Sequence, residues 1–183
     1  GDCAQTLSGL TLIPLGENKI TFSLQDVERV LDKSAKGRVE TKVGVISIET
    51  PVRRQMDRMF SFEEMKTITD FARKNQIKTH LDGARLFVQS VHTNRDPAIF
   101  GSMFDTVYTS LWKCFNAASG AILAGPKSFT ENMFHERRMF GGSLPYAWPY
   151  AAVALHYADW FIPEYKKAWA NAEIFFAAIQ KDE

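Results

Sequence analysis

The chain has 183 residues, of which 45% are hydrophobic and 23% are charged, and its formal net charge is +1. This composition is typical of a globular domain with a sizeable core. Because the charge is close to neutral and no run of Lys or Arg occurs, the composition argues against a nucleic acid or an anionic membrane surface as a partner.

Hydrophobic periodicity predicts strands that alternate with helices along the chain. Strands are predicted at residues 10–15, 42–49, 76–81, 106–111 and 120–125, the last of them an inner strand of the sheet. Helices are predicted at residues 23–32, 61–74, 84–91, 127–140 and 146–179, the last with a break or kink near Pro163. The strand-helix alternation indicates a mostly parallel sheet with helices on both faces, which is a three-layer α/β/α fold.

Short polar signals mark several helix ends. Ser23 is predicted to cap the N-terminus of the first helix, and Ser61 and Glu64 have the spacing of a capping box. Gly141 and Gly142 suit a helix C-cap or a turn near a ligand, because glycine adopts positive φ easily.

The start of the chain and its cysteines bear on the cellular setting. The first predicted strand lies very close to Gly1, and no initiator Met precedes it, so we expect the chain to be a fragment of a longer protein. The first residues lack the basic and then apolar pattern of a secretory signal, and no apolar segment reaches the roughly 20 residues that span a bilayer. Cys3 and Cys114 form neither a disulfide framework nor a metal-ligand spacing. A cytoplasmic location without a membrane partner is therefore predicted.

Chemically active side chains follow two of the predicted strands. Asp82 follows the strand at 76–81, with Arg85 three residues later, and Lys113 follows the strand at 106–111. Ligands of open α/β sheets bind beyond the carboxyl ends of the strands, so we expect the acid and the amine to face one crevice. A lysine amine holds pyridoxal phosphate as a Schiff base, while an aspartate keeps the pyridine nitrogen protonated. The pattern predicts a pyridoxal-phosphate site.

At these residues the sequence resembles the threonine aldolase and β-eliminating lyase family of fold-type-I pyridoxal-phosphate enzymes. The resemblance rests on residues 80–87 (HLDGARLF), on Lys113 followed by residues 117–125 (AASGAILAG), and on residues 137–142 (RRMFGG). The order and the approximate spacing of these motifs also agree with the family. The resemblance covers most of the chain, from about residue 20 to residue 156.

The resemblance implies a role for each residue and a fold for the chain. Lys113 would bind the cofactor covalently, Asp82 would pair with its pyridinium nitrogen, and Arg85 would lie beside its phenolic oxygen and the substrate carboxylate. Residues 1–160 would be part of the large cofactor-binding α/β domain of the pyridoxal-phosphate-dependent transferases. Residues 161–183 would form a helix toward a small C-terminal domain outside this chain. Because sites in this family form between subunits, a homodimer or homotetramer is implied.

Each candidate residue also has a purely structural interpretation. Asp82 suits a turn or cap, Lys113 suits a solvated position, and Arg85 suits either a cap of the following helix or a partner of a surface acid. Ser110, together with Thr109, either donates to the cofactor phosphate or is packed within its strand.

The histidines predict no metal site. His80 points to the same face as Asp82 by strand alternation, and it either hydrogen-bonds that acid or fills the core, which we favour. His92, His135 and His156 share no ligand spacing with acids or cysteines.

The resemblance implies an activity. The expected function is that of a pyridoxal-phosphate-dependent lyase that takes a β-hydroxy or other β-substituted amino acid as its small-molecule substrate. It would either cleave the Cα–Cβ bond, as a threonine aldolase does, or eliminate the β-substituent.

Departures from the family pattern leave an alternative open. Pro145 stands where an arginine is usual, Met56 and Asp57 stand where a glycine pair is usual, and Trp112 replaces a small residue. Pro145 and the pair Met56 and Asp57 motivate the alternative of a noncatalytic, dimer-forming remnant of the same scaffold. The resemblance also implies that a Gly-Thr phosphate loop and a C-terminal carboxylate-binding arginine lie outside this chain, which leaves an inactive fragment as a further alternative. A nucleotide-binding α/β domain is disfavoured, because no Gly-x-Gly-x-x-Gly or Gly-Lys-Ser/Thr loop occurs.

Overall fold

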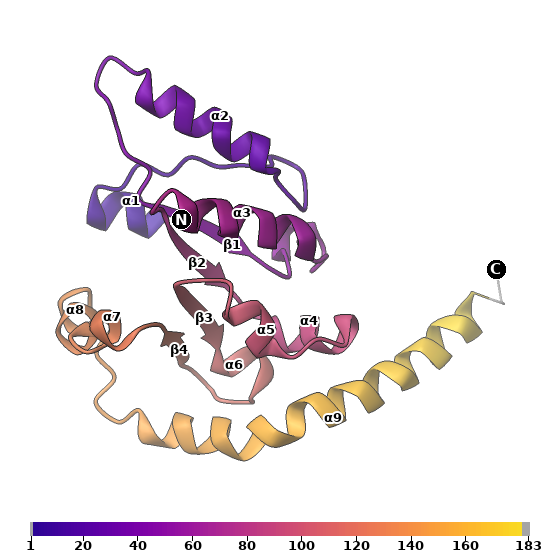
Figure 1. The fold of residues 1–183 in the computed structure, drawn as a ribbon. Helices are drawn as coiled ribbons and strands as arrows, with labels where there is room; N and C mark the ends of the chain where they lie inside the picture. Colours follow the sequence, from indigo (N-terminus) through magenta and orange to yellow (C-terminus); the bar gives the residue numbers. More distant parts are fainter. Residues whose placement is uncertain (1, 181–183) are drawn as a thin grey trace.

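A mostly parallel sheet lies at the centre of the molecule, as the sequence predicts (Figure 1). The computed structural model describes residues 2–180. The strands of the sheet in this part of the chain are β1 (Val45–Glu49), β2 (Lys78–Asp82), β3 (Thr106–Ser110) and β4 (Ala121–Ala124), in that spatial order. β1, β2 and β3 run parallel to one another, and β4 runs antiparallel to β3.

Helices alternate with the parallel strands. The helices of the described chain are α1 (Asp2–Ser8), α2 (Leu24–Ala35), α3 (Phe62–Lys74), α4 (Leu86–Thr93), α5 (Pro97–Gly101), α6 (Leu111–Cys114), α7 (Lys127–Thr130), α8 (Met133–Met139) and α9 (Trp148–Ile179). The predicted helix at 61–74 is confirmed to its last residue, and α1 is an element that the periodicity did not predict.

Two strand predictions are corrected. Residues 10–15 form no strand and are mostly exposed, because no neighbouring strand pairs with them in the described chain and Pro14 lacks an N–H to donate. β4 was predicted to be an inner strand, but it lies at an edge of the described sheet and all of its residues are exposed.

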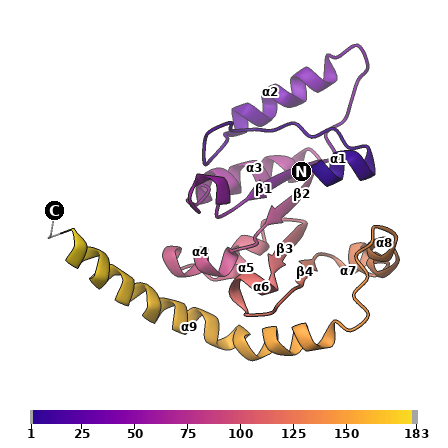
Figure 2. The same ribbon diagram turned by 180° about the vertical axis from the view of Figure 1, so that it is seen from behind.

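Two helix predictions are also corrected. The helix expected at 127–140 is divided into α7 and α8, since Asn132 between them has a non-helical backbone with φ of −105° and ψ of 5°. Near Pro163, α9 continues without the predicted break, although its axis bends in its middle part, as two opposite views show (Figure 2). The segment predicted at 161–183 is thus helical through Ile179, and residues 181–183 lie outside the described part.

The helix caps follow the sequence with one exception. Ser23 and Asp26 form a complete capping box at α2: the Ser23 hydroxyl accepts from the Asp26 N–H at 3.3 Å, and the Asp26 carboxylate accepts from the Ser23 N–H at 2.9 Å. Ser61 caps α3 by accepting from the Glu64 N–H. The Glu64 carboxylate does not close the predicted box; it accepts from the Leu24 N–H at 2.6 Å and so ties the start of α3 to the start of α2.

The main core lies on one face of the sheet. The buried side chains of β1 and β2 on this face pack against α3, α4 and α5, and they are joined by Val27 of α2. Helix α2 lies outside α3 in both views. The buried core residues on the sheet and on these three helices are Ile46, Ile48, Leu81, Met65, Ile68, Ala72, Leu86 and Phe100. On the opposite face, Val45, Ser47 and Glu49 are exposed.

A second cluster fixes α9 beside the end of β3. Phe115, just after α6, makes edge-to-face contacts with Phe87 of α4 at 4.7 Å and with Phe161 of α9 at 5.8 Å between ring centroids. Cys114 and Ala154 are buried in the same cluster. The aromatic run after residue 146 therefore packs helices together, as predicted, through part of its length. Within the described residues, no helix combines the length and the apolar character that a membrane crossing requires.

Candidate active site

The sheet topology brings Asp82 and Lys113 to one edge. Asp82 is the last residue of β2 and pairs in register with Tyr108 of β3. Lys113 lies in α6, which begins directly after Ser110, the last residue of β3. Because β2 and β3 are adjacent and parallel, their carboxyl ends meet at the same edge, where ligands of open α/β sheets bind.

Asp82 is held by a tight turn. Its half-buried carboxylate accepts a hydrogen bond from the Ala84 N–H at 3.2 Å, and the Gly83 N–H donates to the Tyr108 carbonyl oxygen at 2.9 Å. A Cβ atom at residue 83 would lie 3.1 Å from that carbonyl oxygen, which is tighter than ordinary contacts allow. Glycine therefore lets β2 turn away beside β3 without a shift of the neighbouring atoms, and the turn fixes the direction of the Asp82 carboxylate.

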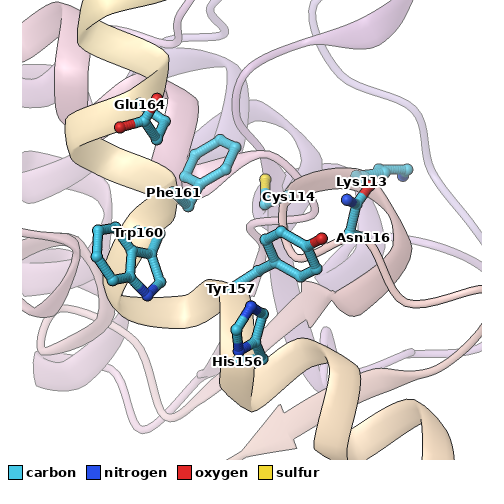
Figure 3. Close-up of a pocket in the computed structure, with 8 residues that line it drawn as sticks. All are labelled: Lys113, Cys114, Asn116, His156, Tyr157, Trp160, Phe161 and Glu164. Atoms are coloured by element: carbon cyan, nitrogen blue, oxygen red, sulfur yellow. The ribbon is translucent and has the colours of Figure 1, made fainter.

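Lys113 borders a pocket of about 540 Å³ between α6 and α9 (Figure 3). Polar and aromatic side chains from the two segments line it: Lys113, Cys114, Asn116, His156, Tyr157, Trp160, Phe161 and Glu164. Asp82, Arg85 and Ser110 do not line this pocket, so the structure does not gather all the predicted site residues in one cavity. The sequence did not predict the contribution of α9, because no motif links it to Lys113.

Arg85 pairs with an acid rather than capping a helix. It stands at the N-cap position of α4, where its side chain makes no capping hydrogen bond. Its Nη1 atom lies 3.5 Å from Oδ1 of Asp57. Of the two structural interpretations of Arg85, the structure thus supports pairing with an acid.

Ser110 is buried without a partner. Strand alternation from Tyr108 places its side chain on the same face of the sheet as Asp82. Its hydroxyl is fully buried, and no hydrogen-bond partner for it, or for the Thr109 hydroxyl, is found among residues 2–180. Buried polar atoms without partners are rare and costly, so the Ser110 hydroxyl suits a ligand that supplies an acceptor oxygen. Thr109, its neighbour in the strand, points to the opposite face of the sheet.

The pKa of the Cys114 thiol depends on burial and on two nearby cations. Burial raises its pKa to about 11, and the positive charges of Arg85 and Lys113 oppose this shift. Two cations from α4 and α6 therefore act on one point near the end of β3. Lys113 thus supplies a positive charge near the end of β3, and the charge of Arg85 is paired with Asp57.

His80 has a partner that the sequence did not predict. Its half-buried ring places Nδ1 2.8 Å from the Thr106 hydroxyl oxygen on β3. Burial lowers the pKa of His80 from its ordinary value, and the nearby Asp82 carboxylate opposes the shift. The expected interpretations, a bond to Asp82 or a place in the core, are thus replaced by a hydrogen bond to Thr106 on the Asp82 face.

This lowered pKa predicts a pH dependence of stability. As the pH falls below about 6.5, a histidine of the unfolded chain takes up a proton, whereas folded His80 resists protonation. The free energy of unfolding should therefore fall as the pH drops below about 6.5. Above that pH, the contribution of neutral His80 to stability should be complete. Urea unfolding at several values between about pH 7.5 and pH 5.5 measures the slope of the free energy of unfolding against pH. His80→Gln should reduce this slope, and His135→Gln, a substitution at an exposed position, should leave it unchanged. Equal slopes for the wild type and His80→Gln would contradict this assignment.

Known proteins resemble the chain along most of its length. A family model described as beta-eliminating lyase matches residues 2–181. A low-specificity L-threonine aldolase of Candida albicans is 37% identical over 98 residues, which are 54% of this chain and 26% of that protein. Low-specificity L-threonine aldolase 1 of Arabidopsis thaliana is 26% identical over 84% of this chain and 44% of its own length.

Solved structures share the fold. A Listeria monocytogenes protein assigned as an L-allo-threonine aldolase superposes with a TM-score of 0.77 at 28% identity, over 89% of this chain and 43% of that one. The threonine aldolase of Leishmania major, at 16% identity and a TM-score of 0.71, shows the fold alone. The chain thus spans less than half the length of these relatives, and the predicted fold class is confirmed.

Proposed function

The chain belongs to the beta-eliminating lyase family, and on that premise we propose that the whole protein is a pyridoxal-phosphate-dependent lyase acting on a β-hydroxy or β-substituted amino acid. The observation that carries the proposal is the placement of Asp82 and the Lys113 helix at the carboxyl ends of two adjacent parallel strands. The names of the relatives support aldol cleavage as the reaction.

The residues present fit the cofactor. Arg85 and Lys113 supply positive charge for an anionic ligand, as their effect on Cys114 indicates. The buried Ser110 hydroxyl suits a phosphate oxygen, and the Asp82 carboxylate on the same sheet face suits a protonated ring nitrogen. A lysine that forms a Schiff base and an acid that pairs with the ring nitrogen are the partners that this cofactor uses, which supports the proposal.

Each side chain would then have one task. Pyridoxal phosphate, when bound, draws electrons away from the substrate carbon that bears the amino group. Asp82, oriented by the Ala84 N–H, would hold a proton at the ring nitrogen. Lys113 would bind the cofactor through Nζ and, when its amine is free, accept and return protons. Arg85 would orient the substrate carboxylate, and Ser110 would donate its hydroxyl proton to a phosphate oxygen.

The proposal extends to the whole protein. Residues 1–160 would belong to the large cofactor-binding domain, and residues 161–183 would lead to a small domain. A cytoplasmic location follows from the cysteine usage. Exposed apolar side chains on α9, such as Leu155, Trp160 and Phe175, support a homodimer or homotetramer.

A second candidate is a noncatalytic remnant of the scaffold. Pro145 in place of an arginine removes one positive charge expected near the phosphate, and Met56 and Asp57 occupy backbone positions with φ of 54°. Such positions favour glycine. If the whole protein fails to bind pyridoxal phosphate saturably, this candidate replaces the lyase.

One experiment tests the proposed function. The whole protein is titrated with pyridoxal phosphate, and we expect a saturable absorption band near the edge of the visible range that changes when a β-hydroxy amino acid is added. Product analysis then separates the reactions: glycine and an aldehyde indicate aldol cleavage, and a keto acid with ammonia indicates elimination. A protein without the band, or without either product, overturns the proposal.

A further inference from the structure

Asp57 lies in a loop with an unusual backbone. Met56 and Asp57 both have φ of 54°, in the left-handed region that non-glycine residues enter at a cost. Hydrogen bonds fix this conformation: the Asp57 N–H donates to the Val52 carbonyl at 3.1 Å, and the Val52 N–H donates to the Arg58 carbonyl at 2.8 Å. Aspartate enters this region more readily than most residues, and the hydrogen bonds fix the direction in which its carboxylate points.

That side chain meets Arg85. The carboxylate of Asp57 lies 3.5 Å from the Arg85 guanidinium, and the exposed fractions of the two side chains are 48% and 24%. The distance exceeds the 2.7–2.9 Å or so of a hydrogen-bonded pair of opposite charges. The pair is therefore loose and partly solvated, so another carboxylate can displace Asp57 at small cost.

The loop is anchored to the segment that carries Arg85. The Thr50 N–H donates to the Asp82 carbonyl at 3.1 Å, and the buried Thr50 hydroxyl donates to the Gln89 side-chain oxygen of α4 at 2.7 Å. The Phe60 N–H, on the far side of the loop, donates to the Thr50 hydroxyl oxygen at 3.0 Å. Both ends of the loop are thus fixed to β2 and α4, and Asp57 faces Arg85 because of this framework.

We propose that Asp57 competes with the substrate carboxylate for Arg85 and so sets the affinity of this site for carboxylate ligands. This inference rests on the proposed function, in which Arg85 orients that carboxylate. A ligand carboxylate must displace Asp57 before it reaches the guanidinium. Its binding free energy is therefore weakened by the interaction free energy of the Asp57–Arg85 ion pair. For a partly exposed ion pair this corresponds to a factor of about two to five in affinity.

Acetate tests the competition without the cofactor. The cofactor-free whole protein is titrated with acetate, and NMR follows the ¹H–¹⁵N signal of the Arg85 Nε–H group. This signal is assigned by its loss in Arg85→Lys. Asp57→Asn removes the charge but keeps the shape and the tolerance of asparagine for positive φ. We expect it to lower the acetate Kd by about two- to fivefold. An unchanged Kd, or no acetate-dependent shift of the signal in either protein, overturns the proposal.

A matched control separates local competition from net charge. Asp70 of α3 lies 3.1 Å from Arg73 and 3.0 Å from Lys66 and is 41% exposed, so Asp70→Asn removes partly exposed ion pairs that do not involve Arg85 and changes the net charge equally. We expect this variant to bind acetate as the wild type does. If it gains as much affinity as Asp57→Asn, general electrostatics explains the effect and the proposal is wrong.

Kinetics of the cofactor-loaded protein test the link to the substrate. With L-threonine as the probe, Asp57→Asn should lower KM by about the same two- to fivefold and leave kcat unchanged. A tighter acetate complex with an unchanged KM overturns the role in substrate binding. A protein that never binds the cofactor refutes the proposed function, while the acetate comparison still decides whether Asp57 competes for Arg85.

Discussion

Lys113→Ala is expected to abolish the absorption band of the bound cofactor and to lower lyase activity by at least about 10³-fold. The physical reason is that Lys113 is the amine beside the end of β3, on the edge that also carries Asp82. Alanine has a high helix propensity and fits within the short helix α6. The variant should therefore fold normally, and circular dichroism with an absorption spectrum of the whole protein measures both properties.

Lys33→Ala is the control for Lys113→Ala. Lys33 lies in the last turn of α2, which packs on α3 away from the strand ends, and its substitution removes the same charge from an exposed helix. We expect it to retain the band and the activity. Retention of the band by Lys113→Ala would show that another amine holds the cofactor, and the assignment of Lys113 would then be wrong.

Local sequence signals predicted the parallel part of the fold well. The helix at 61–74 has a Ser61 cap and apolar residues such as Met65, Ile68 and Ala72 at helical spacing, and these become the buried face of α3. β1 and β2 alternate buried and less buried residues, which is the period of a strand with one packed face. Signals of this kind lie within one element, so they can be recognised without knowing its neighbours.

Predictions that depended on a neighbour were less successful. Leu10, Leu12 and Ile13 have the apolar character of a strand, but a strand also needs a partner to satisfy its backbone, and these residues remain exposed. β4 was recognised as a strand, yet its place at the edge follows from its antiparallel pairing with β3. A sequence pattern does not contain this information about pairing.

The candidate site divides in the same way. Asp82 and Lys113 were predicted from their places near the ends of two strands together with the motifs that resemble the family, and the topology then places them on one edge. The pair between Asp57 and Arg85 was not predicted, since it joins two separate loops through side-chain directions. The sequence did point to residue 57 as a departure from the family glycine pair, and the positive φ there explains why glycine is usual.

Asp82→Asn is expected to lower kcat by about 10²-fold or more while the protein remains folded. Asparagine keeps the size of the side chain and an oxygen that can accept from the Ala84 N–H, but it carries no negative charge. If the carboxylate holds a proton at the ring nitrogen of the cofactor, loss of the charge weakens that bond and the electron withdrawal that depends on it. Steady-state kinetics and thermal unfolding of the cofactor-loaded whole protein measure the two effects.

Asp96→Asn decides between this role and a purely structural one. Asp96 precedes α5 and accepts from the Ala98 N–H at 2.7 Å, which is the same local bond, two residues along the chain, that Asp82 makes with Ala84. If Asp82 is only a structural turn residue, the two substitutions should have similar, small effects on stability and no effect on kcat. A catalytic carboxylate predicts a loss of kcat for Asp82→Asn alone. Equal kcat values for the two variants would reduce Asp82 to a turn residue, and the proposed cofactor site would then lose the charge on which its chemistry depends.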